Sequence, residues 1–235
     1  MTEETGTNSN RVSETIGVIT QHIRANELGP GDRLPSENSL SRELNVSRSV
    51  IREAFRSLAA MRLINLSVGK RATVAQLDHG AMSLMIEHGV LTEQISVQQV
   101  YDVRRTIETR TVTLASLRRT DAEAQRIRQH AMEMMKHIED ADQVMENDLA
   151  FHMAIAQASR NPVFAMIVGA FQGVARQSWP IGWRSRSSFD ARKENVQNHI
   201  DIADAIATGD PEKSARLMKL HFDDSTKVLL DAGLT

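Results

Sequence analysis

The sequence predicts a mainly α-helical protein made of an N-terminal winged helix-turn-helix with a small β-hairpin and a C-terminal all-α bundle of six or seven helices. Three observations predict it. Two short helical segments are joined by a tight turn, two short apolar segments follow around the turn GKR, and apolar residues from about Leu77 onward recur only at helical spacing. No convincing strand pair or internal repeat is found in this second part.

The N-terminal elements follow in order. The first ten residues are polar and predict a disordered tail, residues 1–10. Apolar residues at helical spacing predict a helix over about 12–26, which the Gly- and Pro-rich stretch LGPGDRLPSE ends. Ser36 and Ser47 are natural N-caps for the two short helices, which the dipeptide NV connects. With the hairpin LINLSV and ATVAQL, residues 11–76 form the predicted winged domain.

The rest of the chain is predicted to be helical. Residues 77–94 are expected to be a linker and connecting helix, and residues 95–235 a helical domain. Breaks between helices are predicted at LTEQIS, RRTDAEA, SRNP, SWPIGW and TGDP, which carry the capping and turn residues of helix ends.

Composition limits the chemistry. Cysteine is absent, so disulfides, thiolate nucleophiles and zinc–cysteine sites are excluded, and His, Asp and Glu are the remaining strong metal ligands. Neither a signal peptide nor an apolar membrane span is present, so a cytoplasmic protein is expected. Residues 11–76 hold ten Lys/Arg against six Asp/Glu, a balance of +4, whereas residues 77–235 hold eighteen against twenty-two. The first segment can meet an acidic partner.

The second short helix presents polar residues opposite its apolar face. Arg48 and Arg52 can each donate two hydrogen bonds to guanine in a major groove, while Ser47 and Ser49 can hold phosphates. Arginines on an exposed helix face are also an ordinary solvated surface. The preceding helix and the following hairpin favour DNA binding.

The run GPGDRLPSENSLSRELNVSRSVIREAFRSLAAMRLI closely resembles the N-terminal domain of GntR-superfamily bacterial repressors. The resemblance implies DNA contacts from Arg48, Ser49 and Arg52, with Gly69 at the wing tip approaching the minor groove. This wing lacks the second glycine common in the family, and we expect Lys70 to contact phosphate instead.

Two pairs of polar residues stand out in the helical part. Asp148 and His152 lie one turn apart on a predicted helix, among apolar residues. His199 and His221 each lie about eleven residues from Asp210, at the turn TGDP, so an antiparallel hairpin places them at the same height. These four side chains suit a divalent metal, with Zn²⁺ first and Ni²⁺ or Mn²⁺ as alternatives. The other interpretation is a helix-face hydrogen bond and two buried, hydrogen-bonded histidines.

Residues 95–228 resemble the FCD domain of the FadR-like branch of the same superfamily, on the stretches YDVRRTIETR, NDLAFHMAIAQASRNP, NHIDIADAIATGDP and ARLMKLHF. The resemblance implies that all four polar residues bind a metal at the floor of an effector pocket. It also favours Arg104 as the arginine turned inward to an effector carboxylate, with Arg105 at the surface. Arg176 is the second candidate.

These observations predict a ligand-responsive transcription regulator, a repressor released by a small carboxylate such as a sugar acid, hydroxy acid or dicarboxylate bound beside the metal. A homodimer is expected because one recognition helix reads few base pairs and a two-fold protein matches a palindromic operator. An enzyme is the alternative, since three histidines and a carboxylate around an open metal position can activate water. No HExxH is present, so a non-enzyme is preferred. In a third interpretation the metal itself is the signal.

Overall fold

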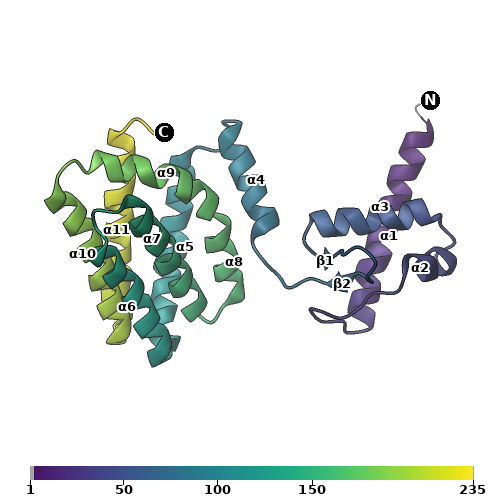
Figure 1. Ribbon diagram of the computed structural model, residues 1–235, viewed down its shortest axis with the longest axis horizontal. Helices are drawn as coiled ribbons and strands as arrows, with labels where there is room; N and C mark the ends of the chain where they lie inside the picture. Colours follow the sequence, from purple (N-terminus) through teal and green to yellow (C-terminus); the bar gives the residue numbers. More distant parts are fainter. Residues whose placement is uncertain (1–2, 235) are drawn as a thin grey trace. The chain divides into compact units, whose positions relative to one another are not determined.

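The computed structural model describes residues 3–234, which divide into two compact units, one up to Ala81 and one from Met82. The described chain is mostly helical with one small antiparallel sheet, so the predicted fold class is confirmed (Figure 1). The elements are α1 (Glu3–Ala25), α2 (Glu37–Glu43), α3 (Arg48–Ala60), β1 (Ile64–Asn65), β2 (Thr73–Val74), α4 (Gly80–Leu91), α5 (Val97–Arg118), α6 (Asp121–Lys136), α7 (Ala141–Ala158), α8 (Pro162–Ala170), α9 (Gln172–Ser185), α10 (Phe189–Ala207) and α11 (Pro211–Asp231).

The N-terminal unit is a winged helix-turn-helix with its own core. Ser36 and Ser47 cap α2 and α3 through hydrogen bonds from the backbone N–H of Ser39 and Val50, as the sequence predicts. Strands β1 and β2 pair over two residues each, so the hairpin is shorter than its apolar segments suggest. The core is built from α1, α2 and α3, from the segment between α1 and α2, and from the hairpin; its largest fully buried side chains are Ile19, Leu34, Leu40, Ile51, Leu58 and Ile64.

Helix α1 differs from the prediction at its N-terminal end. It begins at Glu3, inside the segment 1–10 for which a disordered tail is predicted; residues 1–2 lie outside the described residues. Adding residues to an existing helix needs no new nucleus, so a polar segment can continue a helix that packing has already formed. Composition alone does not reveal this.

The C-terminal unit is a helical bundle. Over the described residues, seven helices, α5–α11, follow the connecting helix α4, within the predicted range. Helix α5 packs against α11 and α7, and α10 packs against α6 and α11. Figure 1 shows α9 crossing one end of this bundle. The bundle core contains Phe151, Phe222, Ile127, Met134, Ile155 and Ile202, all fully buried.

One predicted helix break is wrong. The stretch SWPIGW lies inside α9, which continues through Pro180. A proline inside a helix removes one hydrogen bond and costs about 3 kcal/mol. Trp179 and Trp183 stack on each other with centroids 5.0 Å apart, and Trp183 is buried, so packing on both sides of the proline offsets this cost. A break predicted from proline and glycine rests on the local sequence alone, so it leaves out the stabilisation that this tertiary packing supplies.

Helix α4, predicted as part of a connecting segment, packs on the C-terminal unit. Ile86 and Val90 are partly buried in a small cluster with Val100, Phe171 and Val174. The opposite side of α4 is apolar and open to solvent, since the exposed fractions of its largest side chains are 65% for Leu84, 68% for Met85 and 82% for Leu91. No helix in the described part of the chain combines the length and apolar character needed to span a membrane.

Candidate functional site

The start of helix α3 is the first candidate site. Arg48 and Ser49 are exposed there, and the Oγ atoms of Ser47 and Ser49 are 2.8 Å apart. Since Ser47 also caps the helix, its hydroxyl has a structural role in addition to the predicted phosphate contact. The structure places these residues together at the exposed N-terminus of a helix, a position from which backbone N–H groups and hydroxyls bind phosphate.

Arg52 and the wing form a groove beside this helix start. Arg52 lies on α3 with an exposed fraction of 56%, and its Nη2 donates to Oε2 of Glu37 at 3.2 Å, a partner that the sequence did not reveal. The groove between α3 and the hairpin is lined by Arg52, Arg56, Lys70 and Arg71 as well as Glu37. Four cations against one carboxylate make the groove suited to a polyanion.

Gly69 forms the tip of the hairpin. Its φ is +72°, a backbone conformation that other residues adopt only with strain, and an added Cβ would meet no atom within 4 Å. Glycine is therefore required at this position for its backbone conformation and not for lack of space. The turn leaves Lys70 exposed on the adjacent backbone.

The second candidate site is a cluster of three buried histidines in the bundle. His152 comes from α7, His199 from α10 and His221 from α11, and each offers a ring nitrogen within 4.8 Å of the others. The ring centroids of His199 and His221 are 4.5 Å apart, which agrees with their equal heights above the turn at Asp210. Neutral imidazoles gathered from three helices are a borderline donor set typical of Zn²⁺ and neighbouring divalent ions.

Asp148, the fourth predicted ligand, is bound to one of these histidines. Its Oδ1 lies 2.8 Å from Nε2 of His199, while Nδ1 of His199 lies 2.9 Å from the carbonyl oxygen of Asn195. Both ring nitrogens of His199 therefore face oxygen acceptors, so a proton or a cation must lie between Nε2 and the carboxylate. Burial by itself would raise the pKa of Asp148, but the hydrogen bond from His199 and the adjacent histidines hold it far below its usual range.

His221 supplies an unpaired donor atom. Its Nδ1 is buried and has no hydrogen-bond partner among the residues that the structure describes. Burial, and next the proximity of His199 and His152, keep the pKa of His221 well below 6.5, so the imidazole is neutral at pH 7. A neutral, buried, unsatisfied nitrogen costs free energy unless something binds it, and a metal ion is what this donor set fits.

A buried chain of polar contacts leads from His152 to Arg104. Nδ1 of His152 donates to Oε2 of Glu108, and Nε of Arg104 donates to Oε1 of the same carboxylate at 2.9 Å. Burial opposes ionisation of Glu108, but its interactions with His152 and Arg104 lower its pKa; in the same way Glu108 raises the pKa of Arg104 against the effect of burial. The guanidinium lies between two rings, 5.1 Å from the centroids of both Tyr101 and Phe222.

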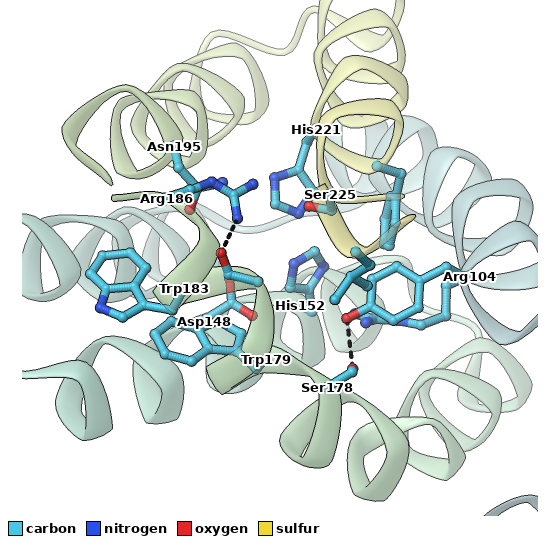
Figure 2. Close-up of a pocket in the computed structure, with 14 residues that line it drawn as sticks. Arg104, Asp148, His152, Ser178, Trp179, Trp183, Arg186, Asn195, His221 and Ser225 are labelled. Atoms are coloured by element: carbon cyan, nitrogen blue, oxygen red, sulfur yellow. Dashed lines mark hydrogen bonds between the residues drawn. The ribbon is translucent and has the colours of Figure 1, made fainter. Parts of the chain in front are cut away.

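Arg104 and two of the clustered histidines, His152 and His221, open onto one cavity. Figure 2 shows Trp179 and Trp183 on one side of it and Arg104 on the other, with His152 and His221 between them. His199 does not line the cavity but contacts it through Asp148, which does. The space open to the centres of water molecules is about 40 Å³, room for roughly three waters. The remaining polar lining comes from Tyr101, Ser178, Arg186, Asn195 and Ser225.

The second effector candidate from the sequence is placed elsewhere. Arg176 does not line the cavity; it forms an exposed ion pair with Glu146. Arg186, ten residues later at the C-terminal end of α9, lines the cavity instead, donating to the carbonyl oxygen of Gly182 at 3.2 Å and to Asp224 at 2.5 Å. Arg105 pairs with Asp223 at the surface, at 2.6 Å.

Sequence reasoning missed Glu108 and Arg186. Glu108 stands four residues after Arg104 on the same helix, a spacing that favours an ion pair, so this signal was present. No comparable signal distinguishes Arg186 from the other arginines of the chain. Its position depends on where α9 ends.

A winged helix-turn-helix joined to a helical domain with a buried polar cavity defines a transcription regulator with a separate ligand-binding domain. Comparison with known families identifies both parts: residues 12–74 match the family described as bacterial regulatory proteins, gntR family, and residues 99–224 match the FCD domain. The chain belongs to the GntR family and carries an FCD effector domain.

Individual relatives agree with this assignment. The chain is 29% identical over 212 residues to the HTH-type transcriptional regulator LutR of Bacillus subtilis, covering 88% of this chain and 95% of LutR. It is 28% identical over 213 residues to the HTH-type transcriptional repressor NanR of Citrobacter rodentium, covering 87% of this chain and 80% of NanR. Among solved structures, Streptococcus agalactiae GntR shares the fold, with a TM-score of 0.64 at 22% identity over 92% of this chain and 99% of that one.

Proposed function

We propose that this protein is a homodimeric repressor whose affinity for operator DNA falls when a small carboxylate binds beside a divalent metal in the FCD domain. One observation carries the proposal: the buried guanidinium of Arg104 and two of the three clustered histidines, His152 and His221, line a single cavity. A fixed cation and a set of metal ligands in one cavity suit an anion with more than one oxygen donor. The relative NanR is named a repressor, which supports repression here.

The metal would be held by His152, His199, His221 and Asp148. The unpaired Nδ1 of His221 and the position between His199 and Asp148 that must hold a proton or a cation both favour this set. Bound there, Zn²⁺, or Ni²⁺ or Mn²⁺ in its place, supplies a Lewis acid that can accept oxygen ligands from the effector. His152 reaches the site with its Nε2, because its Nδ1 is committed to Glu108.

The effector is a small carboxylate. Only Nε of Arg104 is bound to Glu108, so its two terminal nitrogens can form the bidentate pair that arginine makes with carboxylate. The small cavity favours compact acids. Hydroxy acids, sugar acids and dicarboxylates are the candidate classes, since Asn195 and Ser225 can hydrogen-bond hydroxyl groups, and the cavity volume favours compact hydroxy acids and dicarboxylates over sugar acids.

The dimer follows from DNA recognition and from α4. Two copies present two α3 helices to a palindromic site, which multiplies the specificity of one short helix. The exposed apolar side of α4, with Leu84, Met85 and Leu91, offers a surface that a second copy would cover.

Native mass spectrometry of the purified protein tests the assembly and the metal together. The mass of the intact complex shows whether the protein is a dimer and whether it carries a metal ion and a retained ligand. Fluorescence anisotropy on DNA selected by the protein from a random library tests the response, with lactate, gluconate and malate added in turn. We expect at least one acid to lower DNA affinity in the metal-loaded protein only. A change caused by metal alone would instead make the ion the signal, and consumption of an acid without DNA would indicate an enzyme.

A further inference from the structure

We infer that Glu108 is a positioning residue that couples the metal site to the effector arginine, because the same carboxylate orients His152 for the metal and Arg104 for the effector. The inference rests on the proposed function and adds a residue and a regulatory link to it. The observation behind it is the carboxylate of Glu108, which is 2% exposed. One of its oxygens contacts His152 and the other contacts Arg104.

The contact with His152 sets the tautomer of that ring. A carboxylate only accepts hydrogen bonds, so the ring proton at this contact lies on Nδ1 of His152, which leaves Nε2 as the nitrogen that can share a metal with His199 and His221. Removal of such a partner from a metal-ligating histidine typically weakens metal binding by about 10–100-fold.

The contact with Arg104 sets the direction of the guanidinium. Glu108 takes the Nε–H, and the rings of Tyr101 and Phe222 hold the plane between them. The two terminal amino groups are thereby kept for a ligand in the cavity without further ordering, which lowers the entropy cost of binding. A ligand that shifts Arg104 also shifts the carboxylate of Glu108, which orients His152. The effector position and the metal site are therefore coupled through Glu108.

The substitution Glu108→Gln separates the two contacts. An amide has one accepting oxygen and one donating nitrogen, whereas both partners of Glu108 are donors. If the oxygen faces Arg104, the amide nitrogen faces His152 and favours the tautomer with the proton on Nε2, which cannot bind metal. If the oxygen faces His152, the amide nitrogen opposes Nε of Arg104 and releases it. Either orientation therefore breaks one of the two contacts of residue 108, while the volume of its side chain stays nearly the same.

The experiment uses the full-length protein with Zn²⁺ as the only ligand. Zn²⁺ affinity is measured by competition with a chromogenic chelator, and ¹⁵N NMR follows the His152 ring nitrogens and the Nε–H of Arg104 during the titration. Glu146→Gln is the matched control, because Glu146 forms an exposed pair with Arg176 away from the cavity. Its Zn²⁺ affinity should match that of the wild type.

In the wild type we expect the proton on Nδ1 of His152 and a shift of the Arg104 Nε signal when Zn²⁺ binds. In Glu108→Gln we expect either Zn²⁺ binding weakened by about 10–100-fold or loss of the Arg104 response. Unchanged affinity together with an unchanged Arg104 response overturns the inference while leaving the proposed function intact. A wild type that binds no Zn²⁺ overturns the metal part of the proposed function and this inference with it. If Glu108→Gln does not fold, the wild-type tautomer decides: a proton on Nε2 of His152 excludes the link.

Discussion

Nε2 of His199 lies 2.8 Å from Oδ1 of Asp148, and this contact joins the middle of α10 to the middle of α7. Because the other nitrogen of His199 meets a backbone carbonyl, the ring bridges two acceptors. A proton or a cation must therefore lie between Nε2 and the carboxylate, which allows three histidines and a carboxylate to share a buried location.

Metal removal should lower stability. An ion that binds only the folded chain stabilises it by about 2.7 kcal/mol when its free concentration is 100 times its Kd. For a domain of this size we expect the thermal midpoint to fall by roughly 5–10 °C when a chelator removes the ion. Differential scanning calorimetry with and without Zn²⁺ measures the shift. Identical midpoints under both conditions would argue against a metal bound in the folded bundle.

His199→Ala and His221→Ala should each lower bound metal and leave DNA binding by the metal-free protein intact. Each substitution removes a ligand from the cluster, while the winged unit has a separate core. Elemental analysis and anisotropy measure the two properties. His137→Ala is the control, because His137 pairs with Glu133 and is not part of the cluster. Full metal occupancy in both cluster variants would exclude these histidines as ligands.

Acid should destabilise the metal-free protein before its carboxylates titrate. The pKa of His221 is lowered well below 6.5 by burial and then by His199 and His152. The unfolded chain therefore binds a proton below pH 6.5 that the folded chain excludes, so this stability is present above pH 6.5 and is lost as the pH falls. The loss from this one group is at most about 1.4 kcal/mol for each pH unit. Urea unfolding at pH 7.5, 6.5 and 5.5 should show it, with a flatter profile for His221→Gln; parallel profiles would contradict the assignment.

Arg104→Ala should weaken carboxylate binding without removing the metal. Loss of a charge-assisted pair in a desolvated cavity costs about 2–5 kcal/mol, so binding falls by a factor of roughly 30 or more. Trp179 and Trp183 are the two tryptophans of the chain and both line the cavity, so intrinsic fluorescence reports binding directly. Arg105→Ala should be nearly silent because Arg105 pairs with Asp223 at the surface. If Arg104→Ala binds the carboxylate as tightly as the wild type does, Arg186 becomes the candidate for the residue that pairs with it.

Arg52→Ala should abolish specific operator binding and leave fold and metal content unchanged. Losing a bidentate base contact costs about 1–3 kcal/mol in each half-site. Arg24→Ala, an exposed arginine on α1 with the same charge change, is the control. Anisotropy on selected and scrambled DNA distinguishes specific from general attraction. Equal affinity of Arg52→Ala and the wild type for the selected DNA would remove Arg52 from the base-reading residues.

Sequence patterns alone determined the order of the elements and those helix ends that carry a clear cap or turn signal. Ser36 and Ser47 act within one turn of their own helices, and the equal spacing of His199 and His221 from Asp210 needs only a short hairpin to bring them level. Such features depend on neighbours in the chain, for which helix geometry is enough.

Tertiary packing decided the rest. The continuation of α9 through Pro180 depends on the stacking of Trp179 on the buried Trp183, and the choice of Arg186 over Arg176 depends on where α9 ends relative to the cavity. Glu108 became part of the site because α7 brings His152, 44 residues later, against α5. In each case the contact joins residues far apart in the chain, and its free energy comes from burial and desolvation that arise only when helices pack.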